Sequence, residues 1–181
     1  MERFAPIQRL SPRAFAPFGE VLSMRDAEPQ LINAGTSRRY NGLGHIVTCG
    51  YHAGAIISLF RSQPRHLPMR VQLLERHPLG TQAFYPLSGH AYLILVAPPL
   101  DFHNADSPPD LGQLTLFRAD PDQGINLGLN VWHHPLLAMD AESEFLVVDR
   151  EGDGVNCVEF RFDPDLAPWI RPDGLYPEGQ V

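Results

Sequence analysis

The sequence contains no lysine, so all 14 basic side chains other than histidine are arginine. Lysine is the nucleophile of Schiff-base enzymes, the anchor of pyridoxal phosphate and a required residue of the P-loop. The absence of lysine therefore excludes these three chemistries. We expect no organic cofactor.

Cysteine is also scarce, because Cys49 and Cys157 are the only two and they form no CxxC pair. Neither a disulfide framework nor a thiolate zinc site is indicated, which fits a reducing cytoplasm. No apolar run reaches the roughly 20 residues of a membrane span, and the N-terminus lacks the apolar core of a signal peptide. We therefore expect a cytoplasmic protein that does not enter a membrane.

Positive charge is in the minority, with 14 Arg against 21 acidic residues and a net charge of −7. No basic run appears, which argues against a nucleic-acid or anionic-membrane surface. Small molecules are the expected partners.

The chain has 181 residues, of which 44% are apolar, and we expect one domain over 1–181. Ser11-Pro12 followed by Gly19 predicts a short N-terminal helix. The rest predicts an all-β fold, an antiparallel sandwich or barrel of which the double-stranded jelly roll is one solution. Residues 98–112 are expected to form an exposed loop beside the barrel mouth, and residues 163–181 an irregular tail. The expected strands are His45–Tyr51, Ala55–Phe60, Val71–Glu75, Thr81–Tyr85, Ala91–Ala97, Gln113–Phe117, Val131–Met139, Glu144–Asp149 and Asn156–Phe162.

Two polar segments, residues 75–82 and 128–135, carry the strongest chemical pattern. Glu75 and His77 share one face of a strand, a Pro-Leu-Gly turn follows, and Gln82 begins the next strand. With His133 they can meet at one point. A carboxylate and imidazoles suit a divalent metal, and the same groups can act as general base and acid without one. The alternative is a solvated strand face.

His133 and His134 are adjacent, so only one of them can point inward from a strand. We choose His133 because its spacing after Gly128-x-Asn130 resembles that of the cupin motif described below, and Asn130 tolerates the left-handed turn at that point. His134 is then expected to have a supporting or structural role, and Trp132 to pack in the core.

Several polar residues lie within apolar surroundings and favour an anion-binding function, since arginine presents a planar fork that matches a carboxylate. Arg38, Arg39 and Arg61 are the arginines of this group, and each of them can instead be an ordinary surface residue. Ser58 and Arg61 are three residues apart, so their side chains point to opposite faces of a strand and at most one faces a cavity. Asp149 with Arg150 can be a structural ion pair. The residues expected to bind substrate are Asn33, Arg39, Tyr40, Ser58 and Arg61.

The spacing of the two polar segments resembles the cupin metal motif, in which His-x-His and an acid precede a distant Pro-x-Gly-x-x-His. Glu75 stands at the first His, Gln82 at the acid, and Gly128-x-Asn130 before His133 replaces Pro-x-Gly. The chain therefore resembles a cupin whose metal ligands are altered.

The longer blocks 74–87, 124–126 and 130–136 resemble the ureidoglycolate lyase family of the cupin superfamily. Weaker support comes from residues 32–35, 39–40, 58–64, 145–150 and 156–157. The resemblance implies a cupin jelly roll, a homodimer and cleavage of (S)-ureidoglycolate to glyoxylate and urea in allantoin and purine breakdown. It also implies nickel, with Glu75, His77, Gln82 and His133 as both catalytic residues and metal ligands.

Three alternatives remain open at this point. One is another metal-dependent cupin enzyme, a dioxygenase or isomerase, although the altered ligands speak against it. The second is a small-molecule-binding cupin without catalysis. The third is an amidohydrolase that releases ammonia from the same substrate, although the chain shows no binuclear metal pattern.

Overall fold

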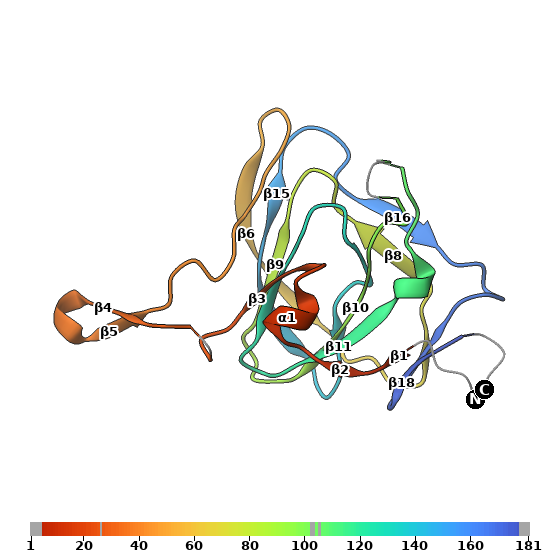
Figure 1. The fold of residues 1–181 in the computed structure, drawn as a ribbon, viewed down its shortest axis with the longest axis horizontal. Helices are drawn as coiled ribbons and strands as arrows, with labels where there is room; N and C mark the ends of the chain where they lie inside the picture. Colours follow the sequence, from red (N-terminus) through yellow and green to blue (C-terminus); the bar gives the residue numbers. More distant parts are fainter. Residues whose placement is uncertain (1–4, 26, 102–103, 105, 178–181) are drawn as a thin grey trace.

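The computed structural model describes residues 5–25, 27–101, 104 and 106–177, and nearly all regular elements are β-strands (Figure 1). The expected all-β fold is confirmed, and the paired antiparallel sheets fit a cupin jelly roll. The helix is also confirmed: α1 (Pro12–Phe15) begins after Ser11, whose hydroxyl accepts from the Ala14 N–H at 3.3 Å. Among the described residues, no helix is long and apolar enough to cross a membrane.

Two large sheets face each other and form the body. The first has the order β16-β8-β13-β10-β11-β2, with β14 also paired to β10, and the second has the order β3-β12-β9-β15-β6. The first consists of β2 (Gln8–Arg9), β8 (Leu73–Arg76), β10 (Tyr92–Ala97), β11 (Thr115–Ala119), β13 (Trp132–His133), β14 (Leu137–Ala138) and β16 (Val158–Arg161). The second consists of β3 (Gly19–Leu22), β6 (Gly54–Ser62), β9 (Gln82–Pro86), β12 (Gly124–Leu127) and β15 (Ser143–Glu151).

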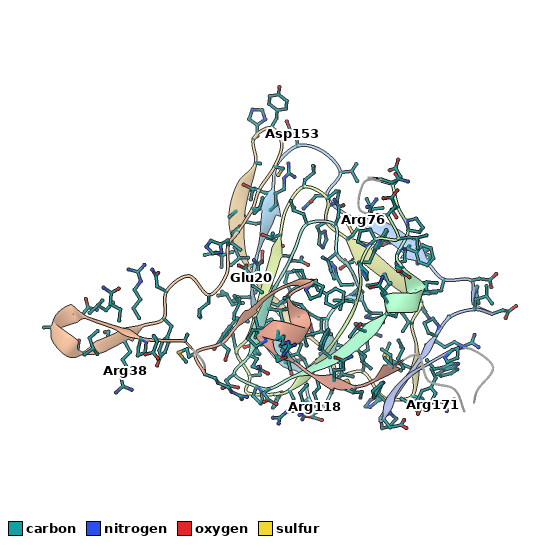
Figure 2. The ribbon with its side chains drawn as sticks, in the orientation of Figure 1. Glu20, Arg38, Arg76, Arg118, Asp153 and Arg171 are labelled. Carbon is teal, nitrogen blue, oxygen red and sulfur yellow. The ribbon has the colours of Figure 1, made fainter. Side chains whose placement is uncertain are left out.

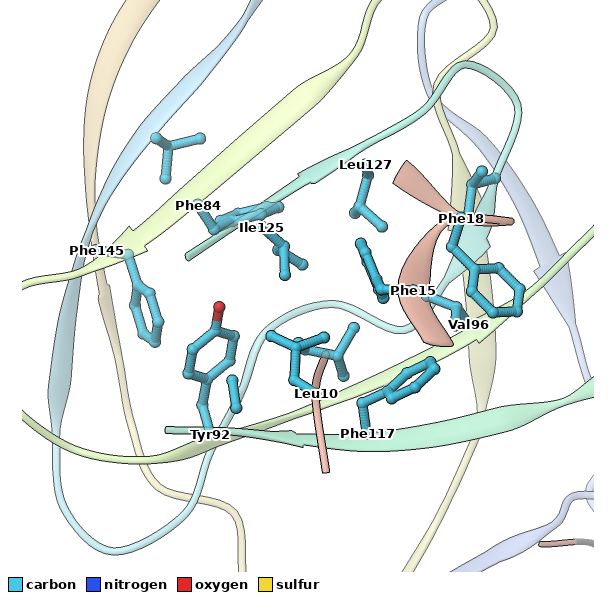
Figure 3. Close-up of a cluster of buried hydrophobic side chains, with 14 residues drawn as sticks. Leu10, Phe15, Phe18, Phe84, Tyr92, Val96, Phe117, Ile125, Leu127 and Phe145 are labelled. Carbon is cyan, nitrogen blue, oxygen red and sulfur yellow. The ribbon is translucent and has the colours of Figure 1, made fainter. Parts of the chain in front are cut away.

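The space between these sheets is filled by a hydrophobic core (Figure 3). Alternate residues of each strand point into it, as the period of two requires. Phe84 of β9 and Phe145 of β15 come from one sheet, whereas Tyr92 of β10 and Phe117 of β11 come from the other. Phe15 of α1 is fully buried against Phe117, so the short helix closes one side of this core.

β10 is buried on both faces, because a second core lies behind the first sheet. This second core packs against a four-stranded sheet in the order β1-β18-β17-β7. Its strands are β1 (Ala5–Pro6), β7 (Met69–Arg70), β17 (Trp169–Arg171) and β18 (Gly174–Tyr176).

Because β17 and β18 are strands, the expectation of an irregular tail over 163–181 is wrong within the described residues, which end at 177. Ile170 and Leu175 are fully buried in the second core, so the alternation of a few apolar residues outweighs the proline-rich and aspartate-rich composition.

The strand expected at His45–Tyr51 is also wrong, since this segment has only an isolated bridge between Thr48 and Gly80. The strand expected at Val131–Met139 is divided into β13 and β14. The loop 98–112 returns to the body, where Ser107 is buried and its carbonyl accepts from the Trp132 indole N–H at 3.2 Å.

A hairpin projects from the body and was not expected from the sequence. It is made of β4 (Gln30–Ile32), the 3-10 turn η1 (Asn33–Gly35) and β5 (Ser37–Arg39). Figure 1 shows it well away from both large sheets. A second short 3-10 turn, η2 (Leu111–Gln113), lies before β11.

Candidate functional site

The site begins with the pairing of β8 and β13, which places Glu75 directly opposite His133. Both side chains point between the two large sheets, whereas their neighbours Leu74 and Trp132 point into the second core. Glu75 Oε1 lies 3.6 Å from His133 Nε2. His133 is buried and Glu75 is half-buried, so solvent reaches the pair mainly through Glu75.

The imidazoles of His77 and His133 are oriented by backbone carbonyls. His77 Nδ1 lies 2.6 Å from the Asn156 carbonyl oxygen, and His133 Nδ1 lies 2.9 Å from that of Val131. A carbonyl can only accept, so each Nδ1 carries the proton and each Nε2 presents a lone pair. Both Nε2 atoms are buried without a hydrogen-bond partner, and the ring centroids are 5.1 Å apart.

These unpartnered atoms fit a divalent metal. One ligand atom from each of Glu75, His77 and His133 lies within 4.8 Å of the others. Histidine ligands in metal sites typically donate the second ring N–H to a carbonyl or carboxylate, which is the arrangement found here. A buried polar atom without a partner is costly, so two such atoms facing one carboxylate indicate that the site accommodates a bound group.

Gln82 lies beside this group at the start of β9, and Asp149 of β15 lies next to it. The pairing of Val148 with Ala83 brings the next inward positions, Asp149 and Gln82, opposite each other. Gln82 Oε1 and Asp149 Oδ1 are both buried without a hydrogen-bond partner.

Asp149 was missed as a site residue by the sequence analysis, which paired it with Arg150. Strand alternation with Phe145 and Val147, both in the core, is the signal that identifies its inward direction. Arg150 instead donates to the carbonyls of Cys49 at 2.7 Å and Asp153 at 2.5 Å.

Charge and burial act in different directions on these groups. Burial alone would raise the pKa of Glu75, but the proximity of His133, whose Nε2 lies 3.6 Å from Oε1, outweighs burial and lowers that pKa. Burial, together with the charge of His133, lowers the pKa of His77, which keeps the imidazole neutral at neutral pH. Burial raises the pKa of Asp149, although its contact with Gln82 works against this. An ionised carboxylate and the neutral imidazole of His77 therefore share one site with His133.

The turn before β13 takes the expected conformation. Asn130 has φ 61°, in the left-handed region, and its N–H donates to the His77 carbonyl at 3.1 Å. Its Oδ1 accepts from Arg76 Nη1 at 3.3 Å, while the Arg76 guanidinium lies 4.8 Å from the centroid of the Trp132 ring. Trp132 packs in the second core, as expected, and the turn ties the two polar segments together.

His134, adjacent in sequence, is also buried, and its Nδ1 lies 2.7 Å from the Pro135 carbonyl oxygen. It lines a cavity of about 410 Å³ together with Arg65 and Arg70. Cys157 has an exposed thiol with Sγ 3.9 Å from Glu75 Oε2. The sequence analysis did not assign Cys157 to the site, although it follows Asn156, whose carbonyl orients His77.

The residues expected to bind substrate do not all gather at this cluster within one chain. Ser58 faces inward from β6, because it pairs with the buried Val147. Arg61 faces outward, where its Nη2 lies 2.6 Å from Glu144 Oε1, so the parity argument holds. Asn33 and Arg39 lie on the projecting hairpin, and Tyr40 follows it.

Antiparallel sheets around a Glu-His-His group define a cupin-type protein with a possible metal site. The family model described as "Ureidoglycolate lyase" matches residues 2–168. The chain belongs to the ureidoglycolate lyase family.

Curated relatives agree with this assignment over nearly the whole chain. Ureidoglycolate lyase 1 of Rhizobium meliloti (strain 1021) is 45% identical over 173 residues, covering 96% of each chain. Ureidoglycolate lyase of Stutzerimonas stutzeri (strain A1501) is 43% identical over 170 residues, or 94% of this chain and 96% of the relative. That of Azotobacter vinelandii (strain DJ / ATCC BAA-1303) is 44% identical over 163 residues, or 90% of this chain and 95% of the relative.

Proposed function

We propose that the chain, acting as a single catalytic domain, cleaves (S)-ureidoglycolate to glyoxylate and urea in purine breakdown. Family membership supports the substrate class. The observation that carries the proposal is the cluster of Glu75, His77 and His133, whose two histidine Nε2 atoms are buried and unpartnered between the sheets.

The reaction needs little from the protein beyond placed acid and base groups. The substrate is a hemiaminal, so its hydroxyl must lose a proton while the departing urea nitrogen gains one. The pKa of Glu75 is lowered, so its carboxylate is ionised at neutral pH and can accept the hydroxyl proton, while His133 Nε2, buried without a hydrogen-bond partner, is the alternative acceptor. Oε1 and Nε2 of the pair lie 3.6 Å apart, so both groups can face the same substrate hydroxyl.

Gln82 is proposed as a fourth polar group beside the reacting atoms. Its Oε1 can accept a hydrogen bond from the urea nitrogens, because it has no partner in the protein. Ser58, inward on the neighbouring strand β6, is proposed as a further substrate contact. Arg61 remains a weaker proposal for the substrate carboxylate, because Glu144 already binds its guanidinium.

Nickel is the proposed metal, held by Glu75, His77 and His133 with Gln82 as a further ligand. When bound, it would polarise the carboxylate and hydroxyl oxygens of the substrate. The oxygen and imidazole donors suit nickel, iron, manganese and zinc alike, so the preference for nickel rests on the family resemblance. A homodimer and a cytoplasmic location are part of the same proposal.

The test is a product assay with purified protein and (S)-ureidoglycolate, in which glyoxylate, urea and ammonia are measured separately. Spontaneous decay without protein is subtracted. Equal enzyme-dependent yields of urea and glyoxylate support the lyase. Ammonia in place of urea would make the protein an amidohydrolase, and binding without any product would make it a non-catalytic cupin.

A further inference from the structure

The projecting hairpin extends away from the body of its own chain (Figure 1). We call residues 27–44 the arm. Within the part of the chain that the structure describes, β4 and β5 of the arm pair only with each other. A Cβ added at Gly35 or Gly42 would meet no heavy atom within 4 Å, whereas one at Gly44, at the base of the arm, would meet Leu22 of the body. An isolated two-stranded hairpin is at best marginally stable in water, so the arm requires another surface.

A second copy of the chain offers apolar surface that matches the arm. Leu31 of the arm is 65% exposed, while Ile57 and Leu59 on the outer face of β6 are 74% and 71% exposed. β6 is also an edge strand of nine residues, hydrogen-bonded on one side only. Long apolar edges are normally covered, and two copies related by a twofold axis would cover both features at once.

The distribution of charge also favours a second copy of the chain as the partner of the arm. The arm has Arg38 and Arg39 against the single acidic residue Glu28, a net charge of +1, whereas the whole chain has a net charge of −7. Figure 2 shows Arg38 on the arm, far from the labelled side chains of the body. Glu75 and the exposed Glu159 lie opposite each other on β8 and β16, beside the open edge of the first sheet. A positive arm and an acidic rim attract each other.

Binding of the substrate carboxylate at Glu75, His77 and His133 calls for a cation that the nearby arginines of the same chain do not supply. Arg76 points to the other face of β8, where it stacks on Trp132. Arg150 is occupied by backbone carbonyls and Arg61 by Glu144. Arg161 lies on the same face of β16 as Glu159, whose Oε2 it contacts at 2.5 Å, and Arg65 lines the cavity beside His134.

We propose that the arm of each protomer crosses to the partner's barrel, where Arg39 binds the substrate carboxylate at the partner's Glu75, His77 and His133. This inference rests on the proposed lyase function. Arg39 is preferred to Arg38 because they lie on opposite faces of β5. Arg39 lies opposite the polar Gln30, whereas Arg38 lies opposite the apolar Leu31, which packs on the partner.

The first experiment locates the arm without using activity. Cys157 provides a thiol beside Glu75, so Arg39→Cys in a Cys49→Ser background is treated with a short bis-maleimide. We expect a covalent dimer that disappears when Cys157→Ser is added. Arg38→Cys is the matched control and should crosslink more slowly. A monomer in light scattering, or a dimer whose Arg39→Cys crosslinks no faster than Cys49→Ser alone, would overturn the inference.

The second experiment asks whose site Arg39 serves. Arg39→Ala should lower kcat/KM by about 10²-fold through loss of a charged contact, while Arg38→Ala and Arg65→Ala have small effects. Heterodimers of Arg39→Ala with His77→Ala, isolated through two tags, then contain one intact site and should recover about half the wild-type activity. Heterodimers no more active than their parents would contradict the exchange. If the wild-type protein makes no urea, the lyase proposal is wrong. The crosslinking result still shows where the arm lies in that case.

Discussion

Glu75 and His133 are direct partners in the register of β8 and β13, so the sheet itself sets the 3.6 Å separation of Oε1 and Nε2. A distance fixed by backbone pairing costs little ordering entropy when substrate or metal binds. His77 is held just beyond the end of β8 by the Asn156 carbonyl. The three groups therefore form a preorganised site.

Metal binding should depend on both imidazoles. His77→Ala removes one of two neutral nitrogen donors and is expected to weaken nickel binding by at least about 10-fold. Isothermal titration with nickel on chelator-treated protein measures this without reference to turnover. His66→Ala, an exposed histidine outside the cluster, is the control and should bind as wild type. Equal nickel affinity in both variants would remove His77 from the metal site.

The turn at Asn130 gives a stability prediction. A φ of 61° is accessible to glycine and asparagine but costs other residues roughly 1–2 kcal/mol. Asn130→Ala should therefore lower the free energy of unfolding by about that amount, whereas Asn130→Gly should lower it less. Urea denaturation measures both. If alanine and glycine destabilise equally, the loss comes from the Arg76 contact and not from the backbone.

Glu20 gives a pH prediction at the base of the arm. Its Oε2 accepts from the His45 N–H and from Asn126 Nδ2, both at 2.8 Å. Burial alone would raise the pKa of Glu20, but the His45 imidazole, whose Nδ1 lies 3.0 Å from Oε1, and the hydrogen bonds from Asn126 and the His45 N–H lower it from its usual value of 4.5. A lowered carboxyl pKa means that the contribution is fully present above pH 4.5 and is lost as the pH falls through the lowered pKa.

Hydrogen exchange of the His45 segment, corrected for intrinsic rates, should therefore show protection that declines only in that acidic window. Glu20→Gln should show weaker protection with no such decline. The same acid decline in the glutamine variant would assign it to another group.

The grouping of Glu75, His77 and His133 in space could be predicted from the sequence, whereas their roles remain a prediction. Alternation on β8 and a glycine-containing turn bring Glu75, His77 and Gln82 together, and the cupin-like spacing after Gly128 and Asn130 favours His133 over its neighbour. Strand alternation places Asp149 on the inward face, but its position beside Gln82 depends on the pairing of β15 with β9, a contact between segments far apart in the chain.

The fold class followed from strand spacing, but two segments were misread. The apolar run at His45–Tyr51 has strand composition, yet β15 pairs with β6 on one edge and leaves this run as a connection with a single bridge at Thr48. The arm escaped prediction because its strands have three residues each and a polar tip at Asn33. No periodic pattern can form over so short a length.

The most direct test of the account compares urea and glyoxylate release from (S)-ureidoglycolate by the wild-type protein and by Glu75→Gln. The substitution keeps the shape of the side chain and removes its charge. We expect equal product yields from the wild type and a rate lower by about 10²–10⁴ in the variant, the usual contribution of a placed base. Near-normal turnover by Glu75→Gln would contradict the assignment of the reaction to this cluster.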